Sequence, residues 1–261
     1  MEKAGESIQS EMDFKLAAGY GALIEWLRGQ LEEAGVEIRT GTVVRAIHWS
    51  AGSVSIEAEA GVRYQAARAV ITLPLGVLKA EADAPGGVRF VPDLADKRGA
   101  MELIEMGEAA RITLRFRRRF WEEPLPIAKP SGKPLFLLVD HAYFPVWWTP
   151  TPLDWPILTG WVGGTRAAKL RGTNEQMWLD QAVDALSQLF GLAEETIRGE
   201  IEAVYRHDWM SDPYTRGAYS YPAVGGLNAA AVLAEPVADT LFFAGEATHT
   251  GGHMGTVHGA I

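Results

Sequence analysis

The sequence predicts an α/β fold of mixed α+β character, built from two interleaved parts. Short runs of β-branched or alternating apolar residues occur in two separate regions, and stretches with helical spacing lie among them. With 261 residues, 48% of them hydrophobic, the chain can bury one large core or two moderate ones. This mixture places the chain among the α/β and α+β proteins.

The first region opens with an amphipathic helix, predicted at residues 20–34. Leucines at positions 23, 27 and 31 recur at helical spacing, and Gly35 stands where a glycine commonly ends a helix. Four short strand-like runs follow, separated by glycines, and we expect them to form a hairpin or meander. The runs span residues 36–40, 42–49, 53–60 and 64–74.

The second region begins near Gly107 and starts with three predicted strands, joined by long proline-rich connections. A helix comes next, because Thr173 and Gln176 have the spacing of a capping box and an apolar face runs from there to Gly191. The strands span 111–116, 135–140 and 157–164, and the connections span 124–134 and 145–156.

The chain closes with a strand at 200–209, an aromatic and glycine-rich stretch, and a strand at 240–247. This last strand delivers Gly245 and Glu246 at its carboxyl end, where ligands usually bind in such sheets. Glycine permits close backbone approach, and a carboxylate accepts hydrogen bonds from sugar or ribityl hydroxyls. A Gly-Gly turn then aims the free N–H groups of a helix start at the same place.

Composition excludes several classes of function. A net charge of −9 and a pI near 5.2 argue against nucleic-acid partners, which need clustered Lys and Arg. The absence of cysteine excludes disulfides, thiolate zinc sites and a thiol nucleophile. The start of the sequence is polar and acidic, and no apolar run approaches the roughly 20 residues that span a bilayer, so no membrane partner and a cytoplasmic location are expected.

Four segments, in order along the chain, closely resemble the flavin-containing amine oxidases, a superfamily that includes monoamine oxidases, polyamine oxidases and lysine-specific histone demethylases. The resemblance covers residues 15–261, nearly the whole chain. The segments are VVRAI at 43–47, TLPLGVLK at 72–79, WMSDPYTRGAYSY at 209–221 and LFFAGEATHTGGHMGTVHGA at 241–260.

The resemblance implies a partial FAD-binding domain interleaved with a mixed-sheet substrate domain. Residues 1–107 would form one part of the FAD-binding domain, 108–225 the substrate-binding domain, and 226–261 the C-terminal part of the FAD-binding domain. Some members attach FAD through a cysteine in the segment that matches 216–219. This sequence has Ala218 there, so the resemblance implies that FAD is bound noncovalently.

Some cofactor contacts carry over from the strands and loops of the family. Val44 matches a residue that lies against the adenine or its ribose, although an ordinary strand valine would look the same. Thr72 and Pro74 belong to a loop that resembles the family's loop beside the cofactor. Trp209 and Tyr214 match aromatic residues near the isoalloxazine ring, and packing in the core is the alternative for either.

The terminal segment supplies the other cofactor contacts. Glu246 matches the acidic residue that holds the ribityl or pyrophosphate portion, and Gly245 matches its glycine partner. Thr256 and Val257 match the helix start beneath the pyrimidine side of the flavin. A metal site among the nearby histidines is not expected, because glycines break the helical register that would align them.

Three residues match positions with catalytic roles. Tyr219 matches the first of two aromatic rings that form a slot for the amine, and His253 holds the position of the second. Arg111 stands where many members have a lysine that bonds through water to flavin N5. Arginine stays cationic and cannot accept a proton at neutral pH, so a structural role for Arg111 is an equal alternative.

One family element is absent from the sequence. We find no strand with a G-x-G-x-x-G turn and helix, the unit that binds the pyrophosphate of FAD. The chain is therefore interpreted as a fragment or the product of a split gene, and a missing N-terminal segment becomes a candidate partner. We expect the chain alone to bind FAD weakly.

The resemblance implies that an amine is oxidised to an imine, which water hydrolyses, while oxygen reoxidises the flavin and forms hydrogen peroxide. The protein's own part would be placement and electrostatics. A related flavin-dependent desaturase or protoporphyrinogen-oxidase-like enzyme is the nearest alternative, although the aromatic Tyr219 favours an amine. The other alternative is a noncatalytic remnant that no longer binds FAD.

Overall fold

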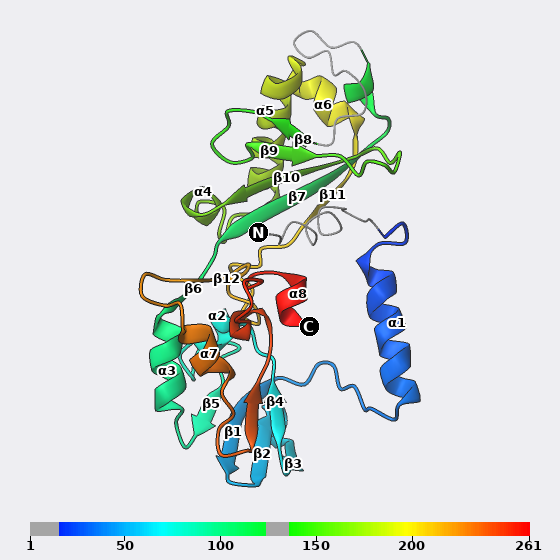
Figure 1. Ribbon diagram of the computed structural model, residues 1–261. Coiled ribbons are helices and arrows are strands. Elements are labelled where there is room, and N and C mark those ends of the chain that lie inside the picture. Colours follow the sequence, from blue (N-terminus) through cyan, green and yellow to red (C-terminus); the bar gives the residue numbers. More distant parts are fainter. Residues whose placement is uncertain (1–15, 124–135) are drawn as a thin grey trace, which may run out of the picture. The chain divides into compact units, whose positions relative to one another are not determined.

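The computed structural model describes residues 16–123 and 136–261 (Figure 1). Helices and sheets are mixed along these residues, which confirms the predicted α/β fold class. The predicted connection at 124–134 lies outside the described residues. The structure divides into two units, which we describe separately. They comprise Met1–Gly41 with Pro150–Trp155, and Thr42–Thr149 with Pro156–Ile261.

Helix α1 (Tyr20–Glu33) belongs to the first unit and confirms the predicted amphipathic helix. It ends because Gly35 adopts φ 76° and Val36 N–H donates to the Leu31 carbonyl at 2.9 Å. The strand predicted at 36–40 is wrong: the Val36 amide is used by the helix terminus, and these residues join no sheet.

The second unit begins with a four-stranded sheet in the order β3-β2-β1-β5. The first three strands pair in antiparallel fashion, as the hairpin or meander prediction requires, and β5 adds a parallel edge to β1. The strands are β1 (Val44–Ser50), β2 (Ser53–Ala58), β3 (Arg63–Ala66) and β5 (Arg89–Val91).

Strands β4 (Ala69–Ile71) and β13 (Leu241–Phe243) form a separate parallel pair, although about two thirds of the chain lies between them. Their carboxyl ends coincide, because Ala244 N–H donates to the Ile71 carbonyl at 3.0 Å. The loop that follows β4 therefore lies beside the turn that follows β13. Figure 1 shows the two strands side by side.

This pair and the sheet that contains β1 share one hydrophobic core. The other elements that contribute to it are α2 (Leu75–Leu78), α3 (Ala95–Glu102), β6 (Ile104–Met106), α7 (Ala229–Ala234) and the 3-10 turn η3 (Glu246–Thr248). Strand β12 (Ser220–Pro222) pairs with β6, and the chain closes with the short helix α8 (Val257–Ala260).

Lys97 on α3 is only 4% exposed, and its ammonium group donates to three carbonyl oxygens at the C-terminal end of α7. Burial lowers the pKa of Lys97. Lys97→Met should lower the free energy of unfolding by about 2 kcal/mol, because it leaves these carbonyls without donors. Urea unfolding measures the change, and Lys169→Met is the control. A cost equal to that of the control would contradict the capping role.

A second core lies under a five-stranded antiparallel sheet in the order β11-β7-β10-β9-β8. Alternate residues of β7 are buried, from Ala110 to Phe116, while Arg111 and Arg115 are exposed on the other face. The strands are β7 (Ala109–Phe116), β8 (Phe136–Leu138), β9 (Val146–Trp148), β10 (Ile157–Gly163) and β11 (Ile201–Arg206).

Helix α5 (Glu175–Phe190) packs its apolar face on this second core. The predicted stop is confirmed, because Gly191 adopts φ 67°. The predicted capping box is wrong: Asn174 is the N-cap and its side chain accepts from Met177 N–H at 2.9 Å. The Thr173 hydroxyl instead donates to a carbonyl of the preceding turn.

The helices α4 (Thr165–Ala168) and α6 (Glu194–Glu200) flank α5 in the sequence. The predicted domain boundaries after 107 and 225 stay predictions.

Candidate cofactor and substrate site

The carboxyl ends of β4 and β13 open onto a cavity of about 210 Å³. Its lining includes four residues that the sequence assigned to cofactor binding: Thr72, Pro74, Gly245 and Glu246. Binding clefts for whole small molecules are commonly about 300–1,000 Å³, so this cavity accommodates only part of a dinucleotide.

Helix α2 lies tightly against the 209–221 segment at Gly76. A Cβ atom on Gly76 would lie 2.7 Å from the carbonyl oxygen of Thr215 and 2.8 Å from that of Arg216. Arg216 itself adopts φ 59°, and its side chain donates to the Pro85 carbonyl. Glycine at position 76 is therefore what allows two of the matching segments to meet.

Tyr219 follows Ala218 of the cavity lining, and its ring contacts two glycines. Cβ atoms built on Gly107 and Gly255 would lie 3.3 and 3.4 Å from its ring carbons. The Tyr219 carbonyl also accepts from Gly107 N–H at 2.7 Å. The glycines leave one side of the ring uncovered, and Tyr219 is 38% exposed.

The Glu246 carboxylate connects the terminal segment to β12. Its Oε2 accepts from the Ser220 hydroxyl at 2.6 Å and from Gly255 N–H at 2.8 Å, and Ser220 N–H lies 3.2 Å from Oε1. A carboxylate oxygen has two lone pairs, so Oε1 keeps acceptor capacity for a further hydroxyl.

The start of α8 follows directly after Gly255. The Thr256 hydroxyl caps this short helix by accepting from Gly259 N–H at 3.1 Å. Val257 is 64% exposed. The hydrogen bond from Gly255 N–H to Glu246 thus fixes the residue that directly precedes Thr256.

The sequence matches the family described as flavin containing amine oxidoreductase over residues 5–261. The chain belongs to this family. Human lysine-specific histone demethylase 2 is 28% identical over 90% of this chain and 27% of its own length. Human peroxisomal N(1)-acetyl-spermine/spermidine oxidase is 28% identical over 96% of this chain and 53% of its own length.

A solved putrescine oxidase, wild type and bound to putrescine, has the same fold. It aligns with a TM-score of 0.70 and 19% identity over 91% of this chain and 50% of that chain. The chain thus spans about half the length of these two oxidases and about a quarter of the demethylase.

FAD is the cofactor that the family implies, and the cavity at β4 and β13 suits part of it. Gly245 adopts φ 125°, and no heavy atom lies within 4 Å of the position of its absent Cβ. A ligand can therefore approach the backbone closely here. The free capacity of Glu246 Oε1 matches a ligand that presents hydroxyl groups.

The other predicted cofactor contacts lie outside the lining of this cavity. Val44 begins β1 and packs against the first core. The Trp209 ring lies beside His207, with centroids 4.1 Å apart. The ring of Tyr214 lies against Gly86. Their contacts with FAD stay predictions.

The other two predicted catalytic residues make no hydrogen bond or ring contact with Tyr219 among the described residues. Arg111 is exposed on β7, opposite Trp161 on β10. The His253 ring is 5.4 Å from that of His249 and 6.2 Å from that of His258, and in the described part of the chain it makes no ring contact with Tyr219. Their roles also stay predictions.

A larger hollow of about 430 Å³ lies between the end of α2, β5 and α3. Its rim carries both signs of charge, including Arg89 and Glu102, and it contains none of the predicted site residues. Within residues 16–123 and 136–261 no cluster of potential metal ligands is found, and no helix there is long and apolar enough to cross a membrane.

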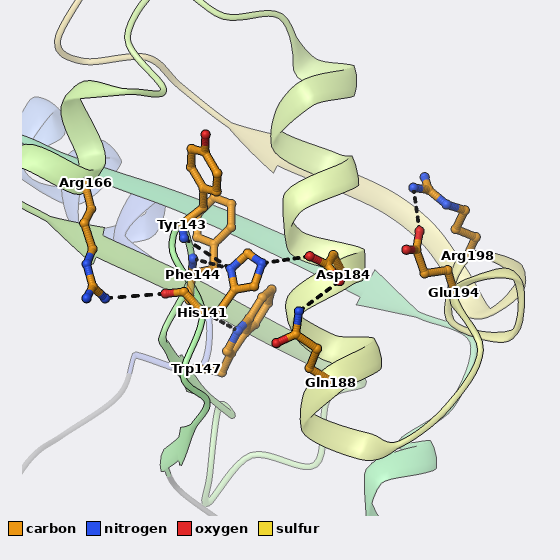
Figure 2. Close-up of polar contacts among 9 residues, drawn as sticks. All are labelled: His141, Tyr143, Phe144, Trp147, Arg166, Asp184, Gln188, Glu194 and Arg198. Atoms are coloured by element: carbon orange, nitrogen blue, oxygen red, sulfur yellow. Dashed lines mark hydrogen bonds and ion pairs between the residues drawn. The ribbon is translucent and has the colours of Figure 1, made fainter.

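A buried histidine in the loop between β8 and β9 was not predicted from the sequence (Figure 2). His141 is 6% exposed, and its Nδ1 accepts from the backbone N–H groups of Tyr143 and Phe144. Its Nε2 faces Asp184 Oδ2 on α5 at 3.1 Å. With both ring nitrogens engaged, His141 ties a loop to α5. No local sequence pattern predicts the contact between His141 and Asp184, because 43 residues separate them.

The same cluster predicts a dependence of stability on pH. A hydrogen bond from Gln188, and then one from His141, lower the pKa of Asp184 below its ordinary 3.8. The ionised carboxyl therefore stabilises the fold above that value, and this contribution disappears as the pH falls through the lowered pKa.

Asp184→Asn should accordingly lower the free energy of unfolding at neutral pH by less than about 1 kcal/mol, since the carboxyl is partly exposed. The difference should shrink as the pH falls through the lowered pKa of the wild-type carboxyl. Urea unfolding over a series of acidic pH values measures this. A difference that stays constant down the series would show that the charge of Asp184 is irrelevant.

Proposed function

We propose that this protein takes part in the flavin-dependent oxidation of an amine to an imine, with reduction of oxygen to hydrogen peroxide. The observation that carries the proposal is the convergence of three matching segments, 72–79, 209–221 and 241–260, on one cavity, with Tyr219 next to Ala218 of its lining. The similarity to an acetyl-spermine/spermidine oxidase and to a putrescine oxidase supports amines as the substrate class.

The bound FAD would supply the redox chemistry by accepting a hydride equivalent from the carbon beside the amine. The chain's own residues would bind and orient. Glu246 Oε1 would accept a hydrogen bond from a hydroxyl of the cofactor. Gly245 and the Thr72–Pro74 loop would line the cavity that holds this part of the cofactor. With no cysteine in the sequence to form a thioether, FAD would be bound noncovalently.

Tyr219 would present its ring to the substrate. Contacts with two glycines fix the ring, so little rotational freedom is lost when an amine binds beside it. His253 would flank the substrate on the other side, and Arg111 would lie on the wall of the substrate domain.

A segment with a G-x-G-x-x-G turn would complete the pyrophosphate site that this sequence lacks. The test uses this chain joined to, or mixed with, such a segment and loaded with FAD. Under anaerobic conditions putrescine, N1-acetylspermine and an aromatic monoamine are added in turn, with a polyene as the control. At least one amine should bleach the flavin absorbance. A form that binds FAD but is reduced by the polyene alone would contradict the amine-oxidation function.

A further inference from the structure

We propose that Ser220 is a positioning residue for Tyr219. With Glu246 and Gly255 it forms a clasp that fixes the Tyr219 ring against two glycines. Ser220 follows Tyr219 directly in the sequence and begins β12, so a restraint on Ser220 is also a restraint on the ring beside it.

The clasp consists of short hydrogen bonds onto one carboxylate. Ser220 contributes its hydroxyl at 2.6 Å, and Gly255 contributes its N–H at 2.8 Å, both to Oε2 of Glu246. Ser220 is 2% exposed, so water does not compete for its hydroxyl. Within the described residues no Lys or Arg forms an ion pair with Glu246, and its carboxylate accepts from the neutral donors of Ser220 and Gly255.

The clasp holds Gly255 against one edge of the Tyr219 ring, which Gly107 also contacts. Gly255 lies against Cδ2 of the ring, and Gly107 lies against Cε2. The Ser220 carbonyl is 3.2 Å from the position of the absent Cβ of Gly255, so any larger residue there would push β12 away. Gly255 also adopts φ 77°, which favours glycine.

The catalytic consequence rests on the proposed function, whereas the clasp itself does not. Hydrogen exchange of the Gly255 and Ser220 amides reports the clasp without any cofactor. 3-Fluorotyrosine labelling followed by 19F NMR reports the ring, and Tyr219→Phe assigns its signal. Ser220→Ala should raise exchange at Gly255 at least tenfold and move the Tyr219 signal toward that of free fluorotyrosine. Ser211→Ala, which removes an exposed hydroxyl from the same 209–221 segment, should change neither.

If Ser220→Ala does not fold, Ser220→Cys replaces it, because a thiol has similar size but is a weak donor. Wild-type exchange and an unmoved 19F signal in the folded variant would overturn the proposal. In the FAD-loaded form, the variant should slow flavin reduction by an amine while leaving the FAD dissociation constant within twofold. If no amine reduces even the wild type, the proposed function fails, and the exchange result still decides the clasp.

Discussion

Replacement of Gly76 by alanine should lower the free energy of unfolding by about 3 kcal/mol, at the upper end for overpacking. The new Cβ would lie within 2.8 Å of two backbone carbonyl oxygens, and backbone cannot move aside as a flexible side chain can. Relief requires α2 and the 215–216 turn to separate, which would also widen the cavity at Thr72 and Pro74. Urea unfolding and FAD titration measure the two effects.

The matched control is Gly99→Ala. Gly99 lies within α3, and no heavy atom is within 4 Å of the position of its absent Cβ. This change should stabilise the fold by about 0.5–1 kcal/mol, because alanine favours a helix interior. Equal effects of the two substitutions would mean that the contact between α2 and the 215–216 turn does not contribute to the fold.

Gly245→Ala should weaken FAD binding by at least about tenfold, or 1.4 kcal/mol. Its φ of 125° and ψ of 175° are accessible almost only to glycine, so alanine would either strain the turn after β13 or rotate it. Rotation would move Glu246, the next residue, out of the cavity lining. FAD fluorescence quenching, with the FAD-loaded form as reference, measures the loss.

Gly225→Ala is the control for backbone strain. Gly225 has φ 83° and also has no neighbouring atom at the position of its absent Cβ, but it does not line the cavity. Its substitution should lower stability by a similar amount and leave FAD affinity unchanged. A similar loss of affinity in both variants would assign the effect to general destabilisation.

Local sequence patterns predicted the features that depend on interactions between residues close in the chain. Helix α1 ends at Gly35 and α5 ends at Gly191, each as the glycine indicated. The errors arose where a competing local bond was available. Asn174 capped α5 in place of Thr173, and the Val36 amide was used by the end of α1 rather than by a strand.

The site could be predicted only in part, because its geometry depends on contacts between distant segments. The resemblance named Glu246 and Tyr219, but only the fold shows Ser220 between them. The sequence gives no reason for a glycine at position 76, because its role depends on the contact between α2 and Arg216 in the fold. His141 and Asp184 carry no periodic or motif signal, and they meet only when α5 packs on the sheet.

Hydrogen–deuterium exchange with and without FAD, on the form completed by a glycine-rich segment, tests most directly whether the matching segments build one cofactor site. Protection should rise together in residues 72–79, 215–221 and 244–257, and it should stay constant in α5. Protection confined to the walls of the larger hollow near Arg89, or no change at the ends of β4 and β13, would contradict a cofactor site there.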